Sequence, residues 1–341
     1  MRSAGSAVRW VARASVLAGL LALAGCSSVG SLYDRVLGRT SGPQPAPLPA
    51  IASPSPVRLL WSASVGRADR FIFAPAVVGD AVYAAARDGT VTRLDAGSGQ
   101  SKWRVSVERR LSGGVGADER TVVVGTDEGE VIALDAASGA VRWRARVSSE
   151  VFTRPAVGAG AVLVRSTDNK VFAFGVDDGR RRWVYQRAPS SLIMRAPSGL
   201  VVVEDTLFAG FPGGKLLAIA VATGAVRWEA TISLPKGSTE LERVTDVVGD
   251  PAFQSREVCA ASYQGRVACF EAVSGRQTWA RDLSSLTGVS LDARYAYVSD
   301  DRGGVHALDR TNGRTIWKQD KLTFRQLSMP LPVGNTVAVG D

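Results

Sequence analysis

Few residues in this sequence are of types that could carry acid–base, nucleophilic or metal chemistry. The 341 residues include one histidine, His306, and three cysteines. Zinc sites and Ser-His-Asp triads need histidines or several thiolates within reach of one another. A zinc or serine hydrolase would therefore depend on His306 alone. We expect His306 to be a packed or rim residue, because it sits in a short alternating segment, 305–308.

The acidic residues offer no general acid–base pair with a supporting geometry. Adjacent acids fall in segments that we expect to be solvated turns: Asp127 and Glu128, Asp177 and Asp178, Asp300 and Asp301. With 45% hydrophobic and 21% charged residues and 36 glycines, the composition is that of a globular protein rich in turns, which excludes disorder as the dominant state.

Cys259 and Cys269 flank a predicted hairpin tip at Gln264-Gly265. A two-residue turn there would pair Cys259 with Phe270, whereas a three-residue turn starting at Tyr263 would place the two cysteines opposite each other. Buried free thiols are the simpler expectation. A disulfide remains open in an oxidising compartment.

The amino terminus is typical of an export signal. Residues 1–13 carry three arginines and no acid, and residues 14–24 are small and apolar but too few to span a bilayer. The sequence Leu23-Ala24-Gly25-Cys26 resembles the bacterial lipobox, which implies cleavage before Cys26 and acylation of that residue. The alternative is an ordinary secretory signal with a chance cysteine. By the same resemblance, Ser27 favours the outer membrane.

Three segments follow from this pattern. Residues 1–25 are the predicted lipoprotein signal peptide. Residues 26–56 are the lipidated cysteine and a tether, since six of the 15 prolines lie between Pro43 and Pro56 and proline favours extended chain. Residues 57–341 are the predicted folded body.

The body is built from a repeat that ends in tryptophan. Six segments share a glycine four residues before a tryptophan, and successive tryptophans are 40, 40, 45, 51 and 38 residues apart. The glycines are Gly99, Gly139, Gly179, Gly224, Gly275 and Gly313. The tryptophans are Trp103, Trp143, Trp183, Trp228, Trp279 and Trp317, with Trp61 as a seventh. A period near 40 with alternating apolar residues predicts an all-β propeller of four-stranded antiparallel blades.

Each blade exposes two apolar faces, so stacked neighbours must supply the core, and the tryptophan is large enough to fill the gap between sheets. Six complete sets end at Trp317, and residues 322–341 begin another blade. We expect Trp61 on an outer strand without partners. Against an eight-bladed ring the chain is roughly 45–50 residues short at this period, which predicts a propeller incomplete at its carboxyl end.

The repeat resembles the tryptophan-docking repeat of PQQ-type quinoprotein propellers. Two segments depart from it, 189–197 and 236–250. Irregular insertions in repeat proteins often carry binding. Leu192 and Met194 beside Arg195 suit a protein interface, although packing between blades is the alternative.

Lipobox, tether, repeats and these two loops together resemble the BamB family, lipoproteins of the β-barrel assembly machinery of Gram-negative outer membranes. The resemblance implies binding to the POTRA domains of BamA through Leu192, Met194, Arg195 and Asp246. Met194 stands where the family has leucine. Val248 replaces a second aspartate, with Asp250 as a candidate substitute.

We therefore expect a scaffold without catalytic residues, metal or cofactor, which holds BamA and offers edge strands to nascent barrel strands. One alternative is a periplasmic PQQ-dependent dehydrogenase, a class marked by vicinal cysteines that this sequence lacks. Another is a propeller lipoprotein with a different partner.

Overall fold

A computed structural model describes residues 43–50, 57–187, 192, 194 and 198–341. The chain divides into two compact units, Met1–Pro45 and Ala46–Asp341, and the strands lie in the second. Cys26 and Arg195 lie outside the described residues. Among the residues that were described, no helix has the length and apolar character needed to cross a membrane.

Residues 76–338 form six four-stranded antiparallel sheets and one two-stranded sheet. The first three sheets are β1 (Ala76–Val78), β2 (Ala81–Ala85), β3 (Thr90–Asp95) and β4 (Ser101–Ser106); β5 (Gly116–Ala117), β6 (Thr121–Gly125), β7 (Glu130–Asp135) and β8 (Val141–Arg146); β9 (Ala156–Gly158), β10 (Ala161–Arg165), β11 (Val171–Gly175) and β12 (Arg181–Tyr185). The next three are β13 (Leu200–Val203), β14 (Thr206–Phe211), β15 (Lys215–Ala220) and β16 (Val226–Thr231); β17 (Val247–Gln254), β18 (Glu257–Ser262), β19 (Arg266–Glu271) and β20 (Gln277–Asp282); β21 (Ser285–Leu291), β22 (Tyr295–Asp300), β23 (Val305–Asp309) and β24 (Thr315–Gln319). The last sheet is β25 (Leu331–Val333) with β26 (Thr336–Ala338).

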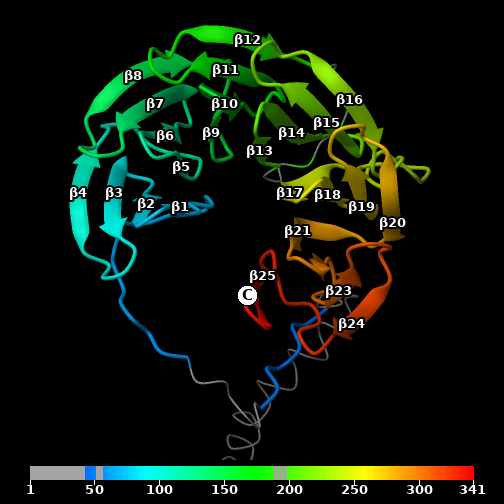
Figure 1. Cartoon of the computed structure of the whole chain (residues 1–341). Helices are drawn as coiled ribbons and strands as arrows, with labels where there is room; N and C mark the ends of the chain where they lie inside the picture. The colour runs from blue at the N-terminus through cyan, green and yellow to red at the C-terminus, as the bar shows by residue number, and fades with distance from the viewer. Residues whose placement is uncertain (1–42, 51–56, 188–191, 193, 195–197) are drawn as a thin grey trace, which may run out of the picture. The chain divides into compact units, whose positions relative to one another are not determined.

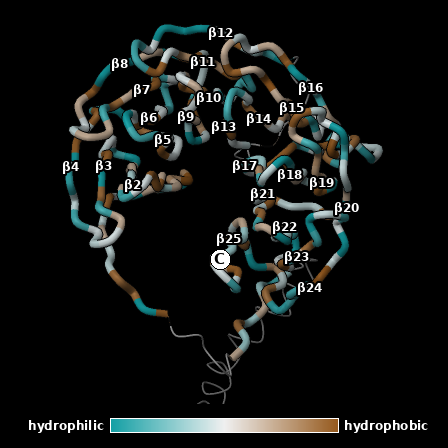
Figure 2. Tube along the Cα trace, in the orientation of Figure 1, coloured by the Kyte–Doolittle hydropathy of each residue, from teal (hydrophilic) through white to brown (hydrophobic). Residues whose placement is uncertain are grey.

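Within residues 46–341 the sheets are arranged radially, as blades of a β-propeller. The first strand of each sheet lies nearest the common centre and the fourth lies on the rim (Figure 1). The inner strands β1, β5, β9, β13, β17, β21 and β25 contact one another in that order. Hydrophilic residues recur along the rim strands β4, β8 and β12 (Figure 2). The predicted blades, and the start of a further one after Trp317, are confirmed.

The core lies between blades. Each buried apolar cluster draws its members from two consecutive sheets, because successive residues of a strand face opposite sides. On β6, Val122 and Val124 pack toward the first blade, whereas Val123 packs toward the third. The middle strands are therefore buried on both faces, and a single blade has no core of its own.

Tryptophan docking joins each blade to the next. The indole Nε1 of a tryptophan donates to a backbone carbonyl of the following blade at 2.6–3.1 Å. The same indole covers the repeat glycine of that blade, whose φ of +65° to +75° favours glycine. A Cβ added to any of these glycines would lie 2.5–2.9 Å from an indole atom. The docked pairs are Trp61 with Gly99, Trp103 with Gly139, Trp143 with Gly179, Trp183 with Gly224, Trp228 with Gly275 and Trp279 with Gly313.

A β-bulge recurs beside the tryptophan of each four-stranded sheet. In the first blade the register between β3 and β4 shifts directly after the residue that pairs with Trp103, and each of the six four-stranded sheets shifts at the equivalent place. The prediction that Trp61 lies on an outer strand is wrong, because no strand forms in the described segment 57–75. Trp61 is held by docking on Gly99, without the hydrogen bonds of a β-sheet. Trp317 is 38% exposed and, in the described part of the chain, has no docking glycine.

Candidate partner-binding site

Two inter-blade loops meet at one side chain. The first loop joins β12 to β13 and contains Leu192 and Met194, and the second joins β16 to β17 and ends at Asp246. Asp246 Oδ2 accepts a hydrogen bond from the backbone N–H of Met194 at 2.7 Å, and Oδ1 accepts one from Gly213 N–H at 3.1 Å. The sequence-predicted residues Met194 and Asp246 are thus brought together across 52 positions of sequence.

The Asp246 carboxylate is internal. It is only 5% exposed, and burial raises its pKa although the two backbone hydrogen bonds lower it. Its two oxygens are occupied by the first loop and by the β14–β15 hairpin. Asp246 therefore holds the backbone of Met194, and it does not project a free charge to a partner.

Leu192 is one of the apolar residues that the two loops expose, together with Leu234 and Leu241 of the second loop. Leu192 is 40% exposed. With Pro235, Arg243 and Val244 of the second loop it lines a cavity of about 210 Å³, which Asp246 also lines. An apolar side chain beside a hollow of this kind can receive an apolar group from another protein.

The two positions that depart from the family pattern are placed differently. Val248 is fully buried on β17, opposite Ala261 of β18. Asp250, on the same strand, forms an ion pair with Arg154 of the third blade, with Nη2 and Oδ2 2.6 Å apart. Asp250 therefore joins the centres of two non-adjacent blades, and the candidate substitute carboxylate is already paired within this chain.

A buried cation beside these loops was missed by the sequence. Arg165 ends β10 and is 5% exposed. It lines a second cavity, of about 270 Å³, together with Met194 and Asp246. A charged residue at the end of an otherwise apolar strand (AVLVR) was the available signal. That signal does not distinguish a rim arginine from a buried one.

His306 and two of the acids expected in turns, Asp300 and Asp127, have partners within the chain. His306 Nε2 lies 2.8 Å from Asp300 Oδ2, whose Oδ1 accepts the N–H of Gly304 at 2.7 Å. Burial opposes ionisation of Asp300, but these hydrogen bonds outweigh it and lower its pKa. Asp127 pairs with Arg87 at 2.5 Å. The arrangement is that of a packed rim histidine.

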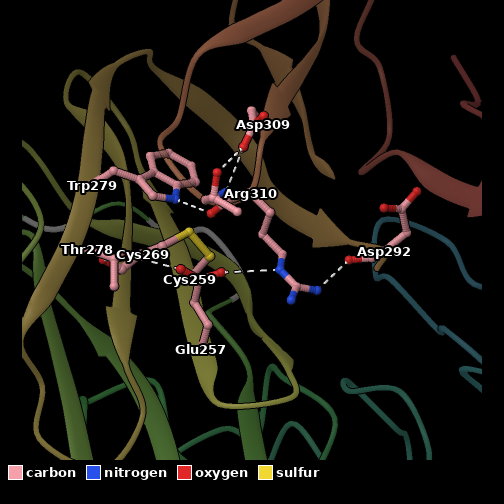
Figure 3. The surroundings of a disulfide bond; sticks show 9 residues. Glu257, Cys259, Cys269, Thr278, Trp279, Asp292, Asp309 and Arg310 are labelled. Atoms are coloured by element: carbon pink, nitrogen blue, oxygen red, sulfur yellow. Dashed lines mark hydrogen bonds and ion pairs between the residues drawn. A yellow bond between two sulfur atoms is a disulfide. The ribbon is translucent and has the colours of Figure 1, made fainter. Parts of the chain in front are cut away.

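Cys259 and Cys269 form a buried disulfide across β18 and β19, so the expectation of free thiols is wrong (Figure 3). The three-residue turn starting at Tyr263 sets this register. Glu257 lies close to both sulfurs, but disulfide sulfurs are not thiolate ligands for a metal. Burial raises the pKa of Glu257, and its ion pair with Arg310 at 3.5 Å ties the fifth blade to the sixth (Figure 3).

The fold and its repeat define a class: β-propellers whose blades are joined by docked tryptophans, with loops between blades forming the candidate site. The family model described as "Outer membrane protein assembly factor BamB" matches residues 52–107 and 87–319. A relative of the same description from Bordetella pertussis is 44% identical over 329 residues, which cover 96% of this chain and 83% of that protein. The chain belongs to the BamB family.

Solved structures agree. The crystal structure of BamB from Moraxella catarrhalis superposes with a TM-score of 0.74 at 29% identity, covering 79% of this chain and 82% of that one. The β-propeller domain of Cps50 (Swd1) from Myceliophteria thermophila has a TM-score of 0.54 at 12% identity, covers 74% of this chain and 86% of that domain, and shows the fold alone.

Proposed function

We propose that this protein is an outer-membrane protein assembly factor that acts as a scaffold. It binds the POTRA domains of BamA and assists the folding and insertion of β-barrel proteins. Membership of the BamB family supports the assembly role, since the matching relatives carry that description. The observation that carries the binding site is the junction of the two loops at Asp246.

The proposed contact surface combines an exposed apolar side chain with one backbone position that Asp246 holds. Leu192 is exposed beside the 210 Å³ cavity, and Asp246 holds the next described residue of its loop, Met194, by a backbone hydrogen bond. A backbone position held in this way loses less conformational freedom on binding than a free one, which favours affinity. Arg195 adjoins Met194 in sequence, and we propose that its guanidinium contributes charge and hydrogen bonds to the same contact.

A scaffold role is favoured over a quinoprotein dehydrogenase. That class is marked by vicinal cysteines, and the sequence has no Cys-Cys pair. The residues of the propeller repeat have a structural role, because each tryptophan packs on the glycine of the next blade.

We also propose that the protein is anchored to the periplasmic face of the outer membrane by lipid on Cys26. The lipobox at 23–26 and the proline-rich segment that follows support this placement. Several acyl chains on one cysteine give firm anchoring, since each buried CH₂ contributes about 0.8 kcal/mol.

Site-specific photocrosslinking in cells tests the function. A photoreactive amino acid at Leu192 should crosslink to BamA. The same amino acid at Val273, which is 79% exposed and lies between β19 and β20, should not. Equal crosslinking from both positions, or none from Leu192, would reject the proposed contact.

A further inference from the structure

Arg165 is a buried cation with unused hydrogen-bond donors. Its Nη1 donates to the backbone carbonyl of Ser198 at 3.1 Å, and its guanidinium carbon lies 4.6 Å from the centre of the Phe211 ring. Its Nε and Nη2 are buried and have no hydrogen-bond partner in the described part of the chain. These two nitrogens form one edge of the guanidinium, with two N–H bonds that point nearly parallel.

The neighbouring acids do not fill this edge. Asp246 lines the same cavity, but its two oxygens accept the N–H groups of Met194 and Gly213. Asp250 favours the charged form of Arg165, yet its carboxylate is paired with Arg154. Glu150 also lines the cavity and has its own interaction.

Arg165 nevertheless keeps its charge at neutral pH. Burial lowers the pKa of its guanidinium to about 10, which is still well above 7. A buried charge without an ion pair destabilises a fold, and ionisable groups perturbed in this way cluster at functional sites.

The cavity beside Arg165 suits an anion on a short apolar stem. Phe152, Phe211 and Pro212 supply apolar walls around about 270 Å³. Thr153, on the same wall, has a buried hydroxyl without a hydrogen-bond partner in the described part of the chain. We propose that this cavity is a carboxylate-binding site in which the Nε and Nη2 edge of Arg165 binds both oxygens of the carboxylate, once the groups that cover these two nitrogens move aside.

The carboxylate has two possible sources of the same chemistry: an aspartate or glutamate side chain of a protein docked on the loops, or the terminal carboxylate of a bound chain. The cavity shares Met194 and Asp246 with the proposed partner site, so an occupant would sit at that contact. The identification of the protein that supplies the carboxylate rests on the proposed function. Carboxylate binding by this chain alone does not.

Calorimetric and NMR titrations of the purified full chain test the inference. The probes are N-acetyl-glutamate methylamide for a side-chain carboxylate and N-acetyl-phenylalanine for a terminal one, with N-acetyl-glutamine methylamide as the neutral control. We expect saturable binding of at least one carboxylate probe and at least tenfold weaker binding of the neutral one. The stronger of the two carboxylates identifies the source.

Variants separate a binding role from a structural one. Arg165→Met should weaken carboxylate binding at least tenfold without lowering Tm, because it removes an unpaired buried charge. Arg165→Lys keeps the charge but loses the two-pronged edge, so it should weaken binding similarly and decides the matter if the Met variant fails to fold. Arg227→Met is the matched control, since Arg227 pairs with Asp205 on the rim and does not line the cavity.

Three results would overturn the inference: no saturable binding of either carboxylate, tighter binding of inorganic phosphate than of both carboxylates, or unchanged carboxylate binding in the Arg165 variants. Crosslinking from Leu192 to BamA that persists alongside such a result would leave the proposed function standing and reject the cavity alone.

Discussion

Replacing a glycine on which a tryptophan docks should weaken the contact between one blade and the next. Gly179 has a φ of +65°, and an added Cβ would lie 2.6 Å from Cδ2 and Cε3 of Trp143. The indole is fixed there by its hydrogen bond to the Val176 carbonyl at 2.9 Å. Gly179→Ala must therefore both adopt a left-handed backbone and displace an indole.

The magnitude follows from adding these two costs. A left-handed backbone costs an L-residue about 1–2 kcal/mol, and overpacking of a filled site costs about 1–3 kcal/mol. We expect Gly179→Ala to lower the free energy of unfolding by about 2–5 kcal/mol. Gly160→Ala is the matched control in the same blade, because Gly160 has a φ of +71° but nothing within 4 Å of an added Cβ. Its loss should be about 1–2 kcal/mol.

Urea unfolding followed by tryptophan fluorescence measures both variants. A second pair of measurements in a Trp143→Leu background isolates the contact, since the extra loss of Gly179→Ala should shrink when the indole is absent. Equal losses for Gly179→Ala and Gly160→Ala would refute the account of docking, because only the first should displace a side chain.

Three further predictions concern charge, redox state and anchoring. Burial opposes ionisation of Asp168, but hydrogen bonds from Lys170 and two serines outweigh it and lower its pKa from 3.8 to about 2. Since the folded pKa lies below the unfolded one, the carboxylate stabilises the fold above pH 4, and this contribution is lost as pH falls through 2. After solvent screening, Asp168→Asn should cost about 1–2 kcal/mol at pH 7 and almost nothing at pH 2 in urea titrations. Replacing Cys259 and Cys269 by alanine opens a cross-link between residues 10 apart and should cost about 2–3 kcal/mol; reaction of both thiols in denatured, unreduced protein would contradict the disulfide. Cys26→Ala should abolish labelling by a palmitate analogue and release the protein from membranes, and persistent labelling would reject lipidation at this residue.

The blades were predictable because their determinants repeat locally. A glycine four residues before a tryptophan recurs at fixed spacing, and turn chemistry and strand alternation lie within a single blade. Trp61 docks in the same way although it lies outside a strand: its indole covers Gly99 and donates to the Ala96 carbonyl.

The electrostatics of the site were not predictable, because they depend on contacts between remote segments. Asp246 is buried against Met194 and Gly213, which are 52 and 33 residues away in the sequence. From the sequence alone, Arg165 is a charged residue at the end of a strand, which is typical of a rim position. In the structure it is buried beside a cavity. The cysteine pairing depended on one residue of turn length, which local propensity does not fix.

The central claim is that the loop containing Leu192 and Arg195 binds BamA. The most direct measurement is the affinity of the purified protein for the POTRA segment of BamA, compared with Leu192→Ala and Arg195→Ala. Truncation of a residue at the centre of an interface costs about 2 kcal/mol or more, or roughly 30-fold in Kd. We predict such a loss with an unchanged Tm for Leu192→Ala, since Leu192 is 40% exposed and exposed loop residues contribute little to folding, and we predict the same pattern for Arg195→Ala. Unchanged affinity in both variants, or a loss that accompanies unfolding, would contradict it.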